Sequence, residues 1–413
     1  MKKRFLLIGY NFHPEPTGIG KYSGEMIYWL AKHGYECTVI TTYPYYPHWK
    51  VQEPYVKSKF WYTTEKLKFS SEGSITVCRC PMYVPAQPSG IKRVLLDFSF
   101  LIAGGIKLLQ LAASNKFDFV FVVSPSFQFG LLGILYKKFR HAKFVYHVQD
   151  MQIEAARDLR LIKSEKAINF LLKIEKYIFD SADVISTISR GMIQKIQDKA
   201  NKNILLFPNW ADIEAFYPIN NRIALKREFG FEVTDKVILY SGAIGEKQGL
   251  EGVLQAADYY RTNKDLKFVI CGSGPYKQKL ENLAKSLLLN NLYFFPLQPS
   301  DKFNSFLNMA DVHLVIQKSD ASDLVMPSKL TTILAVGGLA LITANENSSL
   351  YSMVREHGIG ILIKAESQQA LNEGILIAIS EDNHTITSNA RSYTEANLSI
   401  ESIMEAFTNN INL

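Results

Sequence analysis

Short runs of apolar residues alternate with amphipathic segments along the whole chain. This alternation is typical of parallel α/β proteins, in which buried strands are joined by helices that cover the sheet. A helical spacing also links Ile19, Tyr22, Met26 and Leu30, which predicts one buried helix face. In the first half of the chain the apolar runs predict strands at Phe5–Tyr10, Cys37–Thr42, Ile75–Cys80, Phe119–Val123, Phe144–Val148 and Val184–Thr187, with a closing strand over 204–209.

A second series of strands follows a connector over 208–218 that is marked by Pro, Trp and Asn. We therefore expect two Rossmann-like α/β domains, residues 1–208 and 209–385, and a terminal helix over 386–413. The strands expected in the second domain are Val237–Ser241, Phe268–Cys271, Tyr293–Phe295, Val312–Ile316 and Leu339–Thr343.

Two stretches depart from this rhythm. Residues 43–74 are long, aromatic and basic, and a loop of that length in a compact domain is usually functional or disordered; the aromatic residues argue against disorder. Residues 90–113 are apolar except for Asp97 and Lys107. A buried helix and a helix that lies in a membrane interface beside Lys92 and Arg93 both fit that pattern.

Composition narrows the class of protein. With 47% hydrophobic and 21% charged residues, the 413-residue chain is neither disordered nor a coiled coil. The N-terminus lacks the cleavage site of a signal peptide, so we interpret its apolar run as a strand. Four scattered cysteines do not suit a disulfide framework, which favours a reducing compartment. We expect a cytoplasmic protein.

The net charge of 46 − 39 = +7 is unevenly distributed. Residues 1–206 hold 29 basic and 16 acidic side chains (+13), and residues 207–413 hold 17 and 23 (−6). This asymmetry indicates an anionic partner for the N-terminal half, although a solvated basic surface is the plainer alternative. A nucleic-acid motif is missing, so we expect an anionic membrane surface and no nucleic acid.

Strand–glycine loop–helix junctions are the candidate binding sites, because free amides at a helix start bind anions. Gly18 and Gly20 follow the first strand, where a tight turn is the alternative explanation. Glu15 stands where a P-loop needs glycine, and Ser23 breaks a dinucleotide fingerprint.

The second domain offers three such junctions. Gly242 is followed by Lys247, whose point charge suits a phosphate, and Gly272 with Gly274 repeats the layout. The third is Met326-Pro327-Ser328-Lys329-Leu330, where Pro suits a first helical position and Met cannot cap. Amides left unpaired beside the Lys329 charge would suit a diphosphate, unless water satisfies them.

Taken together, these segments resemble the retaining, metal-independent glycosyltransferases of the GT-B fold, family 4, and most closely the bacterial colanic acid and exopolysaccharide enzymes of the WcaI type. The motifs that carry the resemblance occur in family-like order over nearly the whole chain. They are residues 14–20, Ser186-Thr187-Ile188-Ser189, Pro208-Asn209 with Asp212 and Phe216, Tyr240-Ser241-Gly242, Gly272-Ser273-Gly274-Pro275 and Pro327-Ser328-Lys329-Leu330.

The resemblance implies two Rossmann-like domains that face a cleft, with the C-terminal helix crossing back to the N-terminal domain. It implies catalytic roles for His147, Lys247 and Asp150, and an acceptor side near His13 and Glu15. The donor-binding residues it implies are Gly18, Gly20, Gly242, Lys247, Gly272, Gly274, Leu297 against the base, Ser328, Lys329 and Leu330. It implies no cofactor and no metal, since the nucleoside-diphosphate-sugar is a substrate.

The sequence departs from the family at several of these places. Leu324 and Thr332 stand where the family has paired glutamates, and Asp150 or Glu154 is the nearby carboxylate that could compensate. The resemblance implies sugar transfer, with retention, to a lipid-linked or growing polysaccharide acceptor in cell-surface polysaccharide biosynthesis, on the inner face of the cell membrane. A catalytically silent GT-B scaffold of a polysaccharide-assembly complex and a nucleotide-sugar epimerase are the alternatives.

Overall fold

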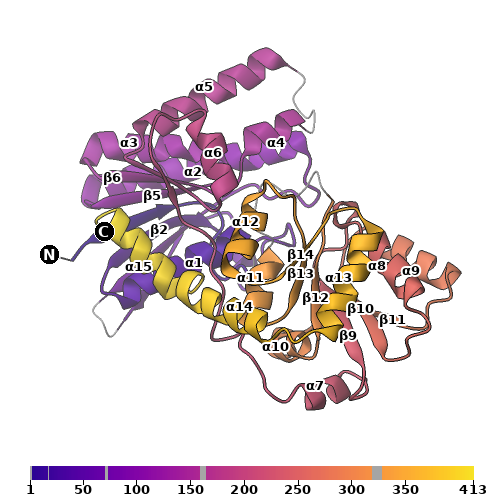
Figure 1. Ribbon diagram of the computed structural model, residues 1–413. Coiled ribbons are helices and arrows are strands. Elements are labelled where there is room, and N and C mark those ends of the chain that lie inside the picture. The colour runs from indigo at the N-terminus through magenta and orange to yellow at the C-terminus, as the bar shows by residue number, and fades with distance from the viewer. Residues whose placement is uncertain (1, 17, 70–72, 159–163, 319–327) are drawn as a thin grey trace. The chain divides into compact units, whose positions relative to one another are not determined.

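The computed structural model describes residues 2–16, 18–69, 73–158, 164–318 and 328–413. The chain divides into two compact units. Unit 1 comprises Met1–Asn209 and Met404–Leu413, and unit 2 comprises Trp210–Ile403. Each unit is an α/β layer structure built around its own sheet (Figure 1).

The sheet of unit 1 has eight strands in the order β3-β4-β2-β1-β5-β6-β7-β8. All neighbours are parallel except β3, which pairs antiparallel with β4 at the edge. The central strands are buried on both faces, as expected of a parallel sheet covered by helices. The strand bounds are β1 Arg4–Ile8, β2 Glu36–Thr42, β3 Thr63–Lys68, β4 Ser74–Cys80, β5 Phe119–Ser124, β6 Lys143–Val148, β7 Val184–Thr187 and β8 Ile204–Leu206.

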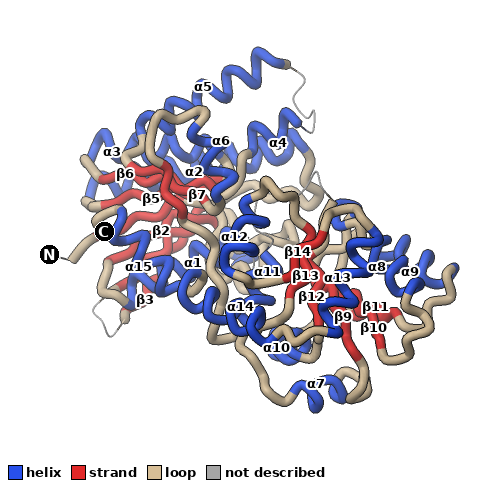
Figure 2. The backbone as a smooth tube through the Cα atoms, in the orientation of Figure 1, coloured by secondary structure: helices blue, strands red, loops and turns tan. Residues whose placement is uncertain are grey.

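Helices cover both faces of this sheet (Figure 2). Because side chains alternate along a strand, Val120 and Val122 face one layer and Phe119 and Phe121 the other. The first layer is made by α2 Gly90–Ser114, α3 Gly130–Arg140, α5 Glu165–Ser181 and α6 Arg190–Gln197, and the short α4 Gln152–Asp158 contacts α5. The helix α1, Gly18–Lys32, also packs on β2 and β4.

The helix α2 is, by length and composition, apolar enough to cross a membrane, and only a third of its most apolar window is buried. Within unit 1 it packs against β2, β4 and α3. Leu96, Phe100 and Leu108 enter the core from its inner face, together with the carboxyl group of Asp97. This helix is therefore neither fully buried nor free of the domain.

Unit 2 contains a six-stranded, wholly parallel sheet in the order β11-β10-β9-β12-β13-β14. Its strands are β9 Lys236–Ser241, β10 Leu266–Cys271, β11 Leu292–Phe295, β12 Val312–Val315, β13 Ala340–Thr343 and β14 Ile361–Ile363. One core packs α8 Glu251–Tyr259, α9 Lys277–Ser286 and α13 Gln368–Ser380 on the sheet. The opposite side is covered by α7 Arg222–Glu228, α10 Ser300–Asn308, α11 Ser328–Ala335, α12 Ser349–His357 and α14 His384–Asn397.

The C-terminal segment differs from the expected single helix over 386–413. It forms two helices, α14 and α15 Ile400–Asn410. The first packs against α11 inside unit 2, where Arg391 Nη1 donates to the main-chain oxygens of Ala335 and Phe216. Only the last ten residues belong to unit 1, where Phe407 stacks on Phe207 and Lys3 Nζ donates to Asn412 O, so that the two termini lie side by side (Figure 1).

Candidate active site

The carboxyl ends of parallel strands are where open α/β sheets bind ligands, at the point where the strand order reverses. In unit 2 this switch point lies between β9 and β12, which are neighbours in the sheet. From β9 the chain runs outward to β10 and β11, and from β12 it runs the other way to β13 and β14. The connections that leave β9 and β12 therefore run in opposite directions, and the carboxyl ends of these two strands are the expected binding site.

Three lysines gather at this switch point. Lys247 is exposed in the loop after β9, and its main-chain oxygen accepts a hydrogen bond of 3.0 Å from the amide of Lys318 in the loop after β12. Lys329 lies in the first turn of α11 and directs its Nζ to the ring of Tyr240 on β9, 3.9 Å from the ring centroid. A Cβ atom built on Gly242 would lie 3.9 Å from the same Nζ.

The ammonium group of Lys329 is buried and makes no hydrogen bond to any residue that the structure describes. Burial disfavours the charged form and lowers the pKa of Lys329 to about 7. A cation–π contact with Tyr240 offsets part of that cost. A buried cation without a counter-ion is expensive, so the arrangement is suited to an anion that completes it.

Gly272 and Gly274 are needed for the close approach of two loops. A Cβ atom on Gly272 would lie 1.9 Å from Gly242 O, and one on Gly274 would lie 2.1 Å from Ile244 O. The amide of Ile244 donates to Ser273 O at 2.9 Å. These glycines thus hold the loop after β9 against the loop after β10, at the same carboxyl edge as the lysines.

The remaining expected donor residues of unit 2 are distributed around that edge. Leu297 follows β11 and is largely exposed. Ser328 is the first residue of α11, and the side chain of Leu330 is buried in the core rather than directed at a ligand. Leu324 lies outside the described residues, and Thr332 lies within α11.

In unit 1 the loop after β1 is organised by a buried carboxylate. Glu15 accepts hydrogen bonds from Asn11 Nδ2 at 2.8 Å and from the amides of Tyr45 and Tyr46 at 3.1 and 3.0 Å. A Cβ atom on Gly20 would lie 2.5 Å from its Oε2. Glu15 and Gly20 therefore share one packing site that joins the start of α1 to the aromatic segment, and both are buried.

Gly18 and His13 lie at the surface of the same loop. Gly18 opens α1 with φ +60°, a conformation that favours glycine. His13 contacts the ring of Tyr28, and its main-chain oxygen accepts from Arg79. The buried Arg79 guanidinium also pairs with Glu65, which holds the aromatic and basic segment in place.

His147 is the next-to-last residue of β6 and is only 2% exposed. Gln149 Nε2 donates to His147 Nε2 at 3.0 Å, so the proton lies on Nδ1, which donates to Ser186 Oγ at 3.0 Å. Burial lowers the pKa of His147 to about 3, and the ring is neutral. His147 thus positions Gln149, which also donates to Asn209 Oδ1, while Asp150 is exposed beside it.

A buried polar cluster at the switch point of unit 1, between β1 and β5, is not among the expected site residues. Tyr10 Oη and Ser126 Oγ lie 3.4 Å apart, and Asp97 reaches them from α2. Asp97 Oδ1 has no hydrogen-bond partner among the described residues, and burial raises the pKa of the carboxyl group. Its position inside an apolar helix is the only sign of this cluster in the sequence.

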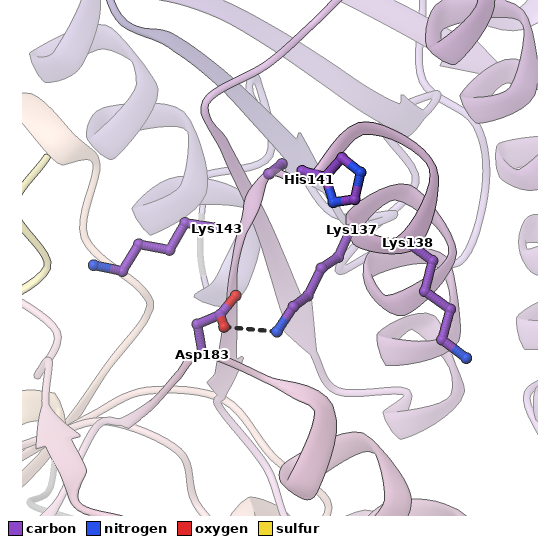
Figure 3. Close-up of a pocket in the computed structure, with 6 residues that line it drawn as sticks. Lys137, Lys138, His141, Lys143 and Asp183 are labelled. Atoms are coloured by element: carbon purple, nitrogen blue, oxygen red, sulfur yellow. Dashed lines mark hydrogen bonds and ion pairs between the residues drawn. The ribbon is translucent and has the colours of Figure 1, made fainter.

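One pocket of unit 1 lies at the edge of its sheet opposite the switch point between β1 and β5. Lys137, Lys138, His141, Lys143 and Asp183 line it at the amino ends of β6 and β7 (Figure 3). Each lysine has a partner there: Lys137 Nζ pairs with Asp183 at 2.6 Å, Lys138 Nζ donates to Tyr177 Oη, and Lys143 Nζ donates to Ile411 O. These contacts tie the three lysines to the fold, and among the described residues only Lys137 is paired with a carboxylate.

Metal-binding side chains do not cluster in the described part of the chain: no three His, Cys, Asp or Glu residues come together there. All four cysteines are buried free thiols.

Comparison with known proteins identifies the family. Residues 221–393 match the family described as "Glycosyl transferases group 1", and residues 17–210 match the "Glycosyl transferase 4-like domain". Over 416 aligned residues the chain is 41% identical to WcaI of Escherichia coli (strain K12), named as a colanic acid biosynthesis glycosyl transferase, and 99% of each chain is covered. This chain is a glycosyltransferase of that family. The glycosyltransferase is also 25% identical to N-acetyl-alpha-D-glucosaminyl L-malate synthase of Bacillus anthracis, over 41% of this chain and 44% of that protein.

Solved structures show that the glycosyltransferase has the GT-B fold. Sucrose-phosphate synthase from Thermosynechococcus elongatus aligns with a TM-score of 0.71 at 15% identity, over 100% of this chain and 98% of that one. HepE of Anabaena, in complex with UDP and glucose, aligns with a TM-score of 0.68 at 13% identity, over 99% of both chains. These structures confirm the expected two-domain α/β architecture, and the sequence matches given above confirm the family.

Proposed function

We propose that this glycosyltransferase moves a sugar from a nucleoside-diphosphate-sugar to a lipid-linked or growing polysaccharide acceptor, with retention and without a metal ion, in cell-surface polysaccharide biosynthesis. The likeness to WcaI supports the polysaccharide role, and the UDP-bound HepE structures support a nucleotide-sugar donor. The observation that carries the proposal is the buried Lys329 ammonium group, which lacks a counter-ion within the described residues at the switch point of unit 2.

The donor diphosphate would lie against the loops after β9, β10 and β12. The negative charge of the diphosphate would be offset by Lys329 of α11 and by Lys247 and Lys318 of the loops after β9 and β12. Gly242 leaves room for a phosphate near Lys329 Nζ, since a Cβ atom there would already lie 3.9 Å from that nitrogen. Gly272 and Gly274 would shape the nucleotide side, and the exposed Leu297 would pack the base.

The chemical step breaks the bond between the anomeric carbon and the β-phosphate oxygen, so negative charge develops on the diphosphate. Fixed cations beside that oxygen stabilise the transition state more than the ground state. The acceptor hydroxyl attacks the face that the diphosphate leaves, and its proton passes to the departing phosphate oxygen. The new glycosidic bond then has the donor's configuration, and no carboxylate base is required.

Unit 1 would bind the acceptor at the loops after β1 and β6. His13 and Gly18 are exposed there, and Asp150 lies beside Gln149, which His147 orients. Glu15 would act through the loop that it holds. The basic N-terminal half would bring the protein to the anionic inner face of the cell membrane, from the cytoplasm.

The proposal is tested by a thermal-shift screen of UDP-, GDP- and ADP-sugars, since a bound donor raises the melting temperature by mass action. We expect one nucleotide to stand out and Lys329→Met to abolish its shift, while the exposed Lys264→Met behaves as wild type. Transfer to acceptor in the presence of EDTA, with the anomeric configuration determined by NMR, tests metal independence and retention. Absence of any donor-dependent shift would favour a silent scaffold, and conversion of free donor without acceptor would favour an epimerase.

A further inference from the structure

The outer face of α2 is an apolar stripe that runs the length of the helix. Its side chains recur every three or four residues and are between 46% and 78% exposed. They are Ile91, Val94, Leu95, Phe98, Ile102, Ile106 and Leu109. A helix rises about 1.5 Å per residue, so the stripe extends for about 27 Å along the surface of unit 1. Large exposed apolar patches of this kind mark interaction sites.

An aromatic segment lies beside α2. Phe60 and Trp61 are 73% and 72% exposed, and the neighbouring Tyr62 Oη donates to Ala103 O of α2 at 3.1 Å. That hydrogen bond fixes the aromatic segment beside the middle of the helix. Exposed Trp, Tyr and Phe next to an aliphatic surface are typical of membrane interfaces.

Cationic side chains border this apolar surface. Lys92 and Arg93 are exposed in the first turn of α2, and Lys57, Lys66 and Lys68 are exposed on the aromatic segment and on β3. The acidic Glu65 among them is already paired with the buried Arg79. From Val94 to Ile106 the only charged residue of α2 is Asp97, which is buried on the inner face.

We propose that the outer face of α2, together with Phe60 and Trp61, is the surface by which this protein docks on an anionic bilayer, with α2 lying flat in the interface. A flat orientation follows from the inner face of the helix: Leu96, Phe100 and Leu108 are core residues, and Asp97 belongs to the polar cluster at the switch point. A helix whose inner face packs into the core of the domain from Leu96 to Leu108 cannot cross the bilayer. The apolar stripe and its basic border complement acyl chains and anionic headgroups.

This inference deepens the proposed function, because it names the surface that would bring unit 1 to a lipid-linked acceptor. Phe98 faces outward while the preceding Asp97 faces the switch point. That switch point therefore lies about one helix diameter, roughly 10 Å, from the docking surface. A lipid-borne diphosphate at the headgroup level would be within reach of the loops after β1 and β5.

The test is sedimentation of the full-length protein with vesicles, without any donor. Wild-type protein is expected to bind vesicles of phosphatidylglycerol and phosphatidylcholine at least tenfold more tightly than phosphatidylcholine alone, and to be released by salt. The triple variant Phe98→Gln, Ile102→Gln, Ile106→Gln is expected to bind about a hundredfold more weakly, because three apolar side chains no longer enter the interface. The matched control is Phe170→Gln, Leu376→Gln, Ile377→Gln, which removes equally exposed apolar residues from α5 and α13.

Since the altered side chains are exposed, the triple variant should keep the wild-type melting temperature and donor-induced thermal shift. The inference is overturned if wild-type protein does not bind anionic vesicles, binds neutral ones equally well, or loses no affinity in the triple variant. It is also overturned if light scattering shows a wild-type dimer that the triple variant converts to monomer, since a second copy would then cover the stripe. Vesicle binding without any nucleotide-sugar binding would instead overturn the proposed function alone.

Discussion

Proton uptake by Lys329 on donor binding is the sharpest consequence of the site. In the free protein, burial lowers the pKa of Lys329 to about 7. A bound diphosphate places negative charge beside Nζ and favours the ammonium form, which returns the pKa toward its ordinary value of 10.5. Binding therefore takes up a proton between about pH 7 and pH 10.5, and affinity falls as the pH rises through this range, because the neutral amine must first be protonated.

The magnitude follows from the pKa of the free protein. The fraction of Lys329 already charged is about three quarters at pH 6.5 and about one thirtieth at pH 8.5, so affinity should fall about 25-fold, or about 1.9 kcal/mol, over this range. At pH 8 about 0.9 proton should be taken up for each donor bound. An intact nucleotide-sugar suits the experiment, because both of its phosphates are esterified and neither titrates in this range.

Isothermal titration calorimetry in two buffers of different ionisation enthalpy measures both quantities. Lys329→Met should bind at least tenfold more weakly at pH 6.5, since a hydrogen bond to a charged group is worth about 1.5–3 kcal/mol, and its affinity should be flat with pH. Lys264→Met controls for general charge and should keep the wild-type slope. A wild-type affinity that does not change between pH 6.5 and 8.5, or a slope that survives in Lys329→Met, refutes the reasoning.

Three further outcomes are expected from the packing of the two units. Without donor, Lys329→Met should melt at a higher temperature than wild type at pH 7, because the folded state lowers the pKa of Lys329 below its unfolded value and so opposes protonation. The melting temperature should rise by about 2–4 °C for each kcal/mol of burial cost that the substitution removes. Calorimetry should show the difference between the two melting temperatures narrowing as the pH rises from 7 toward 10.5. Gly272→Ala should lower the free energy of unfolding in urea by at least about 3 kcal/mol and weaken donor binding, since the new Cβ atom would meet a main-chain oxygen at 1.9 Å. The control, Gly90→Ala, should cost little stability, because a Cβ atom there meets nothing within 4 Å. Glu15→Ala should cost about 2–4 kcal/mol, because it leaves the buried amide of Tyr45 and the partly buried amide of Tyr46 unpaired. Gly20→Ala should cost a similar amount by displacing the Glu15 carboxylate, and a wild-type urea midpoint for either variant would contradict this packing.

Most strands could be predicted because a parallel sheet buried on both faces requires continuous apolar runs. Val184–Thr187 was placed to the residue, and the strands around it differ by one to three positions at their ends. The two strands that the pattern missed lack this signal. β3 is an edge strand whose residues are mostly exposed, and β14 has only three residues, Ile361–Ile363.

The candidate site was only partly predictable for a similar reason. Glycine loops after strands are visible in the sequence, and so is Lys329 next to a helix start. Lys318 follows the predicted strand Val312–Ile316 by two residues, and its place at a strand's carboxyl end is a signal that could have singled it out. The burial of Lys329 Nζ against Tyr240 depends on contacts between α11 and β9, which no local pattern contains.

The glycines illustrate how a correct position can carry a different role. Gly20, in the first turn of α1, and Gly272, in the loop after β10, lie at the expected strand–helix junctions. The space that each glycine leaves open is nevertheless occupied by protein: Glu15 in one case and the loop after β9 in the other. A glycine motif indicates that a larger side chain is not tolerated at that position, and only the structure shows which atoms exclude it.

Lys329, a buried lysine without a counter-ion among the residues that the structure describes, weakens unit 2, and this cost links stability to function. Selection for stability alone would replace Lys329 with an apolar residue of similar length, since a well-packed hydrophobic group is often the more stable choice at such a site. The cost of burying this charge is relieved only when an anion binds. The same cost that destabilises the free unit therefore favours binding of a charged donor over a neutral ligand. The same desolvated environment strengthens the attraction between Lys329 and the developing charge of a leaving diphosphate, because fewer water dipoles compete for it. On this reasoning the stability gained by Lys329→Met and the donor affinity lost by it have one physical origin, and a variant that gained stability while keeping donor affinity would separate them.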